Sequence, residues 1–549
     1  MLKKHVSFLL GSCICLSSLV GCNGNSESKE PVGDIVATVY NNSEVVAAEA
    51  TDMGDVYSWQ AQVFTPSGGN NDMETNNALI KSPWHTLKIN GKSVPVYTAR
   101  CGKGSHSFAW VDVATNKNDF LLEVELTMDT AYGKCVVLPE NKGVEAEIDG
   151  KTYTAYIEKY GSYTYTFNHS VTDEVTDPTL APLTLMVTEE TPLEVPSGYE
   201  KVEIEPGYHE DMDLEFTEEE TVYVMKSGLH EISSIRVPSN SILYIERGAY
   251  LQVTDRQDEH GVWNTRTAIH TEDTSNVQII SRGLLDCGKV LGGDNKRKHV
   301  VGASRSEELT IEGLTIINSN TWTMCLYNCD NAKVNRNLLL GYRTYSDGIM
   351  MSECRDSVGR YNFVRTGDDG IEFKGTGWGG STVGSNCVYE YNDVWTDKGA
   401  AYGLTWESEC DMENMVFRNN NVGFAQPTWA GRCNVLDCRL GTNENVTWSG
   451  IRFENIEIYY VISPNVMMTQ LSGKGANLAD VLFKNITVKS TELGVYAYQM
   501  YFGSAGGSIE NVTLQNINFC GKVLTSDDID NPMYFKFEAN DFKNELTVK

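Results

Sequence analysis

Short segments in which apolar and polar residues alternate recur from residue 35 to about residue 175. Clear examples are HTLKING, FLLEVELTM and GSYTYTF, and the stretches between them are rich in Gly, Asn and Asp. Alternation with a period of two is typical of antiparallel strands that bury one face. We therefore predict an N-terminal β-sandwich domain over residues 35–182, which ends in a polar connector.

A second pattern begins at about residue 183 and continues to the end of the chain. Apolar segments with Asn- and Gly-containing corners repeat at steps of about 20 to 33 residues. Examples are NVQIISRGLLD (276–286), ELTIEGLTIINS (308–319), NCVYEYNDVW (386–395) and SIENVTLQNINF (508–519). No single repeat can bury its own apolar face, so consecutive repeats must stack and share one core. This predicts an all-β chain whose residues 183–549 form a right-handed parallel β-helix.

The first 34 residues have the pattern of an export signal. Lys3 and Lys4 precede the apolar run VSFLLGSCICLSSLV, which ends at Gly21 and Cys22. The segment LVGC resembles the lipobox of bacterial lipoproteins, so we predict a signal peptide over 1–22, lipidation of Cys22 and a flexible tether over 23–34. An ordinary signal peptide cut elsewhere is the alternative. The lipobox implies a bacterial outer-membrane lipoprotein that faces the cell surface or the periplasm.

Composition narrows the classes of partner. The formal net charge of −30 disfavours nucleic acid and other polyanions and favours a neutral ligand. The 14 cysteines include no CxxC pair, which argues against a zinc site. Cys101 and Cys135 could form a disulfide, whereas Cys325, Cys354 and Cys387 recur at coil spacing and are expected to be buried thiols. No nucleotide or metalloprotease motif is present, so we expect no cofactor, no metal and a monomer.

Two short runs carry the strongest chemical signal. YSDGIMM (345–351) contains Asp347, and RTGDDGIEFKG (365–375) contains Asp368 and Asp369. The 21-residue step from Asp347 to Asp368 matches one coil, which would stack the two carboxylates about 4.8 Å apart. Carboxylates this close cannot all ionise freely, so at least one pKa should rise. A protonated acid beside an ionised base is the requirement of an inverting glycosidase. A plain turn or a calcium site is the competing interpretation of each Asp alone.

The region from YSDGIMM to GDDGIEFKG resembles the catalytic segment of glycoside hydrolase family 28, the polygalacturonases. Their clan includes family 49, the dextranases, which carry a β-sandwich before the β-helix and are closer in architecture to this chain. The resemblance implies that Asp368 is the general acid and that Asp347 and Asp369 hold and activate the water. A Gly-His-Gly motif of family 28 would fall at 401–403, where the sequence is AYG. Its Arg-Ile-Lys motif would fall near GFAQP (423–427), where no basic residue occurs.

Several residues near these runs are candidates for contact with a sugar. Trp378 lies in a Gly-rich insertion, and Trp406 and Trp429 lie in later coils, where aromatic faces can stack on sugar rings. Trp406 could equally belong to the core. Tyr402 stands in place of the missing His, and Lys374 could bond hydroxyl groups.

The leading hypothesis is an inverting hydrolase of an α-linked, neutral, dextran-like polysaccharide. The first alternative is a pectin hydrolase that uses Arg343, Arg365 or Lys374 to hold a sugar carboxylate. A β-helix polysaccharide lyase and a non-catalytic glycan-binding lipoprotein are the others.

Overall fold

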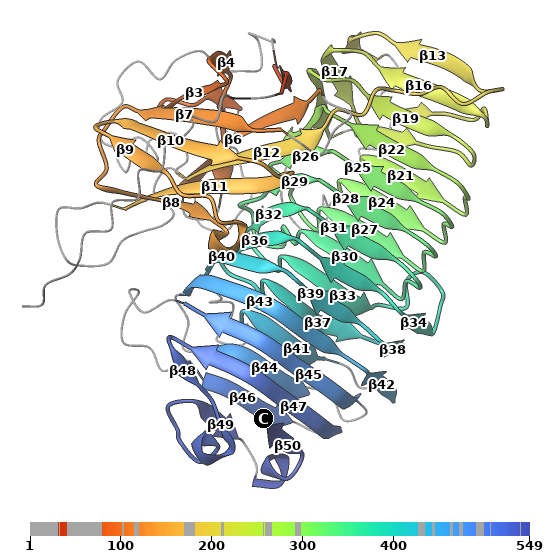
Figure 1. The fold of residues 1–549 in the computed structure, drawn as a ribbon. Coiled ribbons are helices and arrows are strands. Elements are labelled where there is room, and N and C mark those ends of the chain that lie inside the picture. The colour runs from red at the N-terminus through yellow and green to blue at the C-terminus, as the bar shows by residue number, and fades with distance from the viewer. Residues whose placement is uncertain are drawn as a thin grey trace, which may run out of the picture.

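The structure is a computed structural model that consists of a β-sandwich packed against the side of a long β-helix (Figure 1). It describes residues 31, 33–40, 79–101, 104–114, 120–168, 182–209, 213–255, 257, 266–290, 298–426, 434–441, 445–461, 465–471, 476–489, 499–504, 507–537 and 540–549. The predicted signal peptide, Cys22 and Trp429 lie outside these residues. Within them there is no α-helix, and the 3-10 turns are Glu140–Lys142, Ser526–Asp528 and Asn540–Lys543. No helix of this part of the chain is long and apolar enough to cross a membrane.

The sandwich consists of two sheets with an apolar core between them. The first sheet has the order β2-β5-β6-β12-β11-β8, with β1 on β6, and its strands are β1 (Ile35–Ala37), β2 (Ile80–Lys81), β5 (Tyr97–Cys101), β6 (Gly104–Val113), β8 (Lys134–Leu138), β11 (Gly161–Asn168) and β12 (Leu183–Glu189). The second has the order β4-β3-β7-β10-β9, with strands β3 (His85–Ile89), β4 (Lys92–Val94), β7 (Leu122–Met128), β9 (Glu147–Asp149) and β10 (Thr152–Ile157). The alternation of buried and half-buried residues along β7 confirms the pattern in the sequence.

The β-helix is right-handed and carries a twelve-stranded parallel sheet along one face. Its strands are β15 (Asp213–Glu215), β18 (Ser234–Arg236), β21 (Ile269–Glu272), β24 (Val301–Ser304), β27 (Met324–Tyr327), β30 (Ile349–Ser352), β33 (Ile371–Gly375), β37 (Tyr402–Ser408), β41 (Leu436–Leu440), β44 (Asn465–Leu471), β46 (Gln499–Ser504) and β49 (Phe535–Phe537). We call it the site sheet, because it carries the three candidate carboxylates at its edge.

The remaining strands of the β-helix form one bent sheet, which supplies the other two faces. They are β13 (Glu200–Ile204), β14 (Gly207–Tyr208), β16 (Thr221–Met225), β17 (Gly228–Ile232), β19 (Ile242–Ile245), β20 (Ala249–Thr254), β22 (Gln278–Ser281), β23 (Leu284–Lys289), β25 (Thr310–Glu312), β26 (Thr315–Ile317), β28 (Lys333–Asn335), β29 (Leu338–Leu340), β31 (Val358–Arg360), β32 (Phe363–Thr366), β34 (Val383–Ser385), β35 (Val388–Glu390), β36 (Asp393–Thr396), β38 (Asp411–Glu413), β39 (Val416–Arg418), β40 (Asn421–Ala425), β42 (Val446–Ser449), β43 (Arg452–Val461), β45 (Ala476–Val488), β47 (Ser508–Phe519), β48 (Lys522–Val523) and β50 (Leu546–Val548).

The corner between two of these faces is held by a buried ladder of asparagines. Asn337 donates to Asn362, Asn362 to Asn392 and Asn392 to Asn420, with distances of 2.9, 2.9 and 3.1 Å. Each amide satisfies the next one inside the core, where an unpaired polar group would be costly. The Asn-containing corners of the sequence are therefore bonded columns that fix the register of the coils.

The sandwich covers an apolar face of the β-helix. Phe108 and Trp110 of β6 share a buried cluster with Leu340, Phe363 and Trp395 of the β-helix. Polar anchors accompany it: Asp112 binds Arg247 at 2.6 Å and Arg282 at 3.0 Å. Most of these side chains are almost fully buried, so the two parts form one continuous packed interface.

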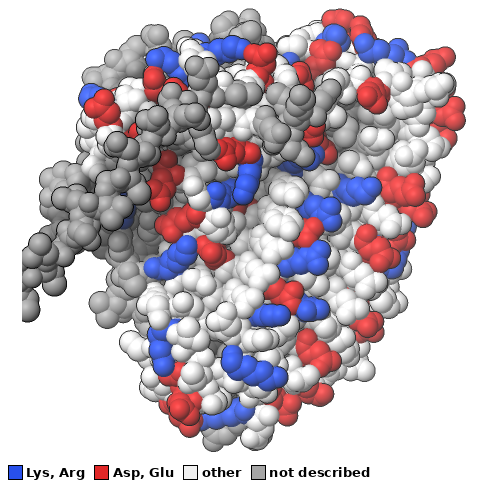
Figure 2. Space-filling model, viewed as in Figure 1, with Lys and Arg blue, Asp and Glu red and all other residues white. Residues whose placement is uncertain are grey.

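Charged side chains of both signs lie side by side on the face of the β-helix that Figure 2 shows. Many are paired between coils, as in Arg305 with Asp273 at 2.5 Å and Arg355 with Asp330 at 2.6 Å. Surface pairs of this kind contribute little each, but in columns they discourage a slip of one coil against the next.

The predicted thiols are in the core, and the suggested disulfide is absent. Cys325, Cys354 and Cys387 are fully buried and unpaired, and Cys101 and Cys135 are both free thiols.

Candidate active site

The two acidic runs lie on consecutive coils at the edge of the site sheet. Ile349 of β30 pairs with Ile371 of β33, so this coil is 22 residues long and brings Asp369 level with Asp347. The Gly348 amide donates to the Asp369 carbonyl at 2.9 Å. The prediction that Asp368 stacks on Asp347 is therefore wrong by one residue.

Close backbone packing explains the glycines beside these carboxylates. A Cβ added to Gly370 would lie 2.6 Å from the Val394 side chain and 2.7 Å from the Ala401 carbonyl oxygen. A Cβ on Gly348 would lie 2.2 Å from the Gly370 carbonyl oxygen. The glycines are required because neighbouring coils approach each other here, and this approach lets all three Asp side chains reach one region.

Each of the three aspartates is nearly buried and has a different set of partners. Their exposed fractions are 4% for Asp347 and 5% for both Asp368 and Asp369. The Tyr345 amide donates to Asp368 Oδ2 at 3.1 Å, and the Ala400 amide donates to Asp369 Oδ1 at 2.6 Å. Asp347 Oδ1 has no hydrogen-bond partner among the described residues. An unsatisfied buried oxygen in this position is available to a water or a substrate hydroxyl.

Burial and mutual repulsion keep two of these carboxyls protonated more readily than usual. Burial, followed by the charge of Asp369, raises the pKa of Asp368 to about 7. Burial, followed by the charges of Glu372 and Asp368, raises the pKa of Asp347 well above its ordinary value. The cluster therefore holds a proton donor at neutral pH, as the sequence predicted.

Glu372 and Lys374 on β33 complete the cluster. Burial raises the pKa of Glu372 to about 8, and the hydroxyl of Thr405 donates to its carboxylate. Lys374 Nζ lies 2.5 Å from Glu407, 3.3 Å from Glu372 and 3.9 Å from Asp347. Burial alone would lower the pKa of Lys374, but these carboxylates raise it overall, so the side chain is a charged ammonium. The predicted sugar contact Lys374 is thus a buried counter-ion of the acidic cluster.

Three carboxylates have the spacing of a metal site. Oxygen atoms of Asp347, Asp369 and Glu372 lie within 4.8 Å of one another. The ammonium of Lys374 already faces Asp347 and Glu372, so the chain supplies its own cation at this point.

The next coils bring in two residues that the sequence reasoning missed. Strand β41 pairs with β37, and it carries Asp437 and Arg439 on the same side. Arg439 Nη2 lies 3.8 Å from Asp369 Oδ2, and Arg439 Nε lies 3.7 Å from Asp437 Oδ2. Burial, partly offset by Arg439, raises the pKa of Asp437 to about 7. The expectation that no basic residue follows the acidic runs is therefore wrong.

An aromatic platform lies beside the cluster on the N-terminal side. The rings of Trp322 and Trp378 stack with centroids 5.5 Å apart, and His299 stacks on Trp322 at 5.7 Å. Lys374 Nζ lies 4.8 Å from the centre of the Trp322 ring, which connects the platform to the carboxylates. Trp378 is 63% exposed, so its ring is open to a ligand. The sequence identified Trp378, but it gave no signal for Trp322.

A groove continues from this platform along earlier coils of the site sheet. His299 and Tyr327 form one side of a cavity of about 410 Å³, which Arg236, Arg266 and His270 also line. The groove runs across strands β18, β21, β24 and β27, so it is long enough to hold several units of a polymer.

Two of the predicted sugar contacts have other positions. Tyr402 is fully buried in the core, because its register partner Ile371 points inward, and its hydroxyl donates to the carbonyls of Asn392 and Asn421. This corrects the prediction that Tyr402 contacts substrate. Trp406 is 38% exposed and its ring lies 5.7 Å from the Arg439 guanidinium, so it borders the site and holds Arg439.

Arg365 also lies elsewhere. It is fully buried under the sandwich, bonded to Asp397 at 3.1 Å and to His106 at 3.1 Å. This excludes it as the residue that holds a sugar carboxylate.

Comparison with known proteins places the chain in a family. The model of "Glycosyl hydrolases family 28" matches residues 257–536, just over half of the chain. Among solved structures, a family 28 exopolygalacturonase from Yersinia enterocolitica is 11% identical, with a TM-score of 0.41, over 78% of this chain and 95% of that chain. Endopolygalacturonase I from Stereum purpureum is 12% identical, with a TM-score of 0.34, over 60% and 94%. The catalytic domain of a GH87 alpha-1,3-glucanase is 9% identical, with a TM-score of 0.37, over 87% of each chain.

A comparison with curated proteins gave no match. The family match confirms the resemblance that the acidic runs carry, and it sets aside the lyase and the non-catalytic binding protein. The chain is a glycoside hydrolase, and it belongs to glycosyl hydrolases family 28.

Proposed function

We propose that the protein hydrolyses an α-linked, neutral polysaccharide with inversion at the anomeric carbon. The observation that carries the proposal is the cluster of Asp347, Asp368 and Asp369, in which a carboxyl with a pKa of about 7 lies beside other carboxylates. An acid and a base on one site surface are what inverting hydrolysis requires.

The proposed reaction assigns a proton to each carboxyl. Asp368 donates its proton to the glycosidic oxygen as the bond from that oxygen to the anomeric carbon breaks. A water held by Asp347 and Asp369 attacks the anomeric carbon from the opposite face, and Asp369 accepts the water's proton. Arg439 and the Ala400 amide both face Asp369, so this carboxylate has positive neighbours before the reaction. Exchange of protons with bulk water then restores the starting state.

Charge balance in the cluster favours a neutral sugar. Six carboxyl groups, those of Asp347, Asp368, Asp369, Glu372, Glu407 and Asp437, surround the two cations Lys374 and Arg439. Both cations already lie within 4 Å of carboxylates. A uronic acid would add another negative charge to this region, which costs free energy unless a free cation meets it.

Arg439 gives specific support to a second candidate, a pectin-like uronide. If a sugar carboxylate displaced Asp437 as the partner of Arg439, the guanidinium could hold it in a forked geometry. Preference for polygalacturonate over dextran, lost on Arg439→Met, would decide for this candidate.

The test is release of reducing sugar from dextran, pullulan and polygalacturonate. We expect turnover of a neutral polymer by the parent protein and a loss of at least about 100-fold in kcat on Asp368→Asn, since general acid catalysis contributes this much or more. The matched control is Asp273→Asn, a surface aspartate paired with Arg305. Equal rates for the parent and Asp368→Asn would remove Asp368 from the mechanism.

We also propose that Cys22 carries a lipid that attaches the enzyme to the bacterial outer membrane. The support is the sequence alone: a basic start, an apolar run and LVGC. Labelling with a radioactive fatty acid should mark the parent and not Cys22→Ser, and labelling of both would contradict the proposal.

A further inference from the structure

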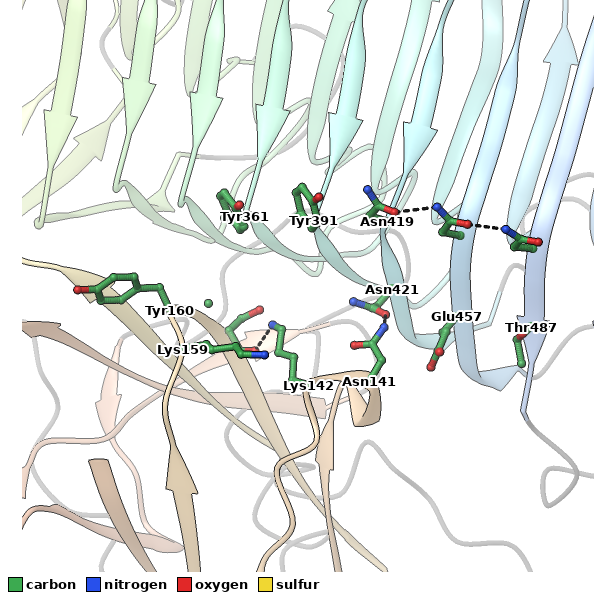
Figure 3. A pocket seen from close by; sticks show the side chains of 14 residues that line it. Asn141, Lys142, Lys159, Tyr160, Tyr361, Tyr391, Asn419, Asn421, Glu457 and Thr487 are labelled. Carbon is green, nitrogen blue, oxygen red and sulfur yellow. Dashed lines mark hydrogen bonds between the residues drawn. The ribbon is translucent and has the colours of Figure 1, made fainter. Parts of the chain in front are cut away.

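A second cavity lies where the sandwich meets the β-helix, on a different face from the carboxylates. It has a volume of about 590 Å³ and is lined on one side by sandwich residues, including Lys142 and Tyr160, and on the other by Tyr361, Tyr391 and a row of asparagines (Figure 3). The proposed catalytic residues do not line it. We propose that this cavity is a second binding site for a neutral oligosaccharide segment of the polymer. The choice of ligand rests on the proposed function.

The helix wall is a column of corner residues with left-handed backbone. Tyr361, Tyr391, Asn419, Asn455 and Asn485 have φ of 56°, 58°, 55°, 55° and 55°. Asn is favoured in this conformation among residues other than Gly, whereas a bulky aromatic residue there is an outlier. The turn therefore explains the three asparagines but does not explain the two tyrosines.

The two tyrosines form an open aromatic surface. Their rings stack with centroids 5.3 Å apart and planes at 11°, and their exposed fractions are 40% and 45%. Both rings line the cavity, as Figure 3 shows for Tyr361 and Tyr391 beside Asn419. Exposed aromatic rings supply apolar contact for the C–H groups of a sugar, while their hydroxyls can exchange hydrogen bonds with it.

The asparagines continue this surface with regularly spaced amides. Asn455 Nδ2 donates to Asn419 Oδ1 at 2.9 Å, and Asn485 Nδ2 donates to Asn455 Oδ1 at 2.8 Å (Figure 3). An amide has two N–H donors and an oxygen with two lone pairs, so each one in the row keeps further bonding capacity. The row repeats once per coil, about every 4.8 Å, and such a ladder suits a chain of repeating hydroxyl groups.

The opposite wall is fixed to the β-helix by polar bonds at the edge of the cavity. Asn141 Nδ2 donates to Asn421 Oδ1 at 2.8 Å, and Lys142 Nζ lies 3.0 Å from Asp393 Oδ2. Lys142 also donates to the Ser162 carbonyl at 2.7 Å. These bonds hold both walls in place before any ligand arrives, which lowers the entropy cost of binding.

The charges of the lining favour a neutral ligand. Lys142 is paired with Asp393, and Glu457 is paired with Lys489 at 2.8 Å. Most of the remaining lining is amide, hydroxyl and aromatic. A pocket with a few polar groups and ring edges is typical of a ligand site, and this set matches carbohydrate better than a charged polymer.

The test is affinity electrophoresis of the full chain in gels that contain dextran, pullulan, polygalacturonate or gelatin. All proteins carry Asp368→Asn, so that the polymer is not degraded. The variant pair is Tyr361→Asn with Tyr391→Asn, which extends the existing asparagine column and suits the backbone at both positions. The matched control is Tyr208→Asn, a tyrosine that is 67% exposed on β14.

We expect dextran or pullulan to retard the Asp368→Asn protein and its Tyr208→Asn control equally. The double tyrosine variant should bind on the order of 10-fold more weakly, and Tyr361→Phe with Tyr391→Phe should recover most of this loss. Equal retardation of the double variant, no retardation by a neutral polymer, or a tyrosine-dependent retardation by gelatin would each overturn the inference. Hydrolysis by the parent protein is measured separately, so the loss of one proposal does not decide the other.

Discussion

Replacement of Asp368 by Asn should make the protein more stable at alkaline pH while it abolishes catalysis. Burial and Asp369 raise the pKa of Asp368 from 3.8 to about 7. A carboxyl whose folded-state pKa exceeds its unfolded value stabilises the fold relatively more at low pH, and this advantage is lost as pH rises toward the folded value. Above about pH 7 the folded protein therefore contains an ionised Asp368 at a total cost of about 4 kcal/mol, at roughly 1.4 kcal/mol for each pKa unit.

The neutral amide of Asn avoids this cost. Between about pH 5 and about pH 8.5 the stability difference between Asp368→Asn and the parent should grow in favour of the variant by about 3 kcal/mol. Urea unfolding at both pH values measures it, because the titration of all other groups largely cancels in the difference. The matched control is Asp397→Asn, which strands the buried Arg365 and should destabilise the protein by about 3–5 kcal/mol at both pH values. A variant advantage that stays constant or shrinks as pH rises would refute the reasoning.

Three further outcomes follow from the site. The hydrolysis rate should fall as pH rises through about 7, because Asp368 must be protonated to act as the acid, and a rate that rises over this range would contradict that role. Lys374→Met should cost about 3–5 kcal/mol in urea unfolding above pH 8 and less at pH 5, where its carboxylate partners are protonated; a pH-independent loss would contradict the proposed counter-ion. Trp378→Ala should raise KM for the polymer about 3- to 10-fold with unchanged kcat and stability, and a fall in kcat alone would place Trp378 outside the substrate path.

The sequence predicted the fold because period-two alternation and coil repeats are local signals. Segments such as 308–319 and 508–519 are strands in the structure, at β25, β26 and β47. The step between coils was harder to predict. It is 22 residues from Ile349 to Ile371 but 31 from Ile371 to Tyr402, because the turns differ in length. This variation led to the error that stacked Asp368, rather than Asp369, on Asp347.

The same variation hid half of the site. Arg439 follows a long turn after β37, so its register with Thr405 could not be read from spacing. Tyr402 faces the core because it pairs with Ile371, and only the pairing reveals which way it points. Trp322 reaches Lys374 from a neighbouring coil, a contact that no local pattern encodes. Acidic residues in distinctive runs can be found from sequence, whereas partners set by the stacking of coils cannot.

The anomeric form of the first product tests the central claim most directly. Proton NMR during the first minutes of hydrolysis of an α-linked polymer, before mutarotation, reports whether the new reducing end is β or α. The account predicts the β-anomer, formed when water held by Asp347 and Asp369 attacks opposite to the oxygen that Asp368 protonates. An α-anomer as the first product would show retention through a covalent intermediate, and it would contradict the assigned roles of all three aspartates.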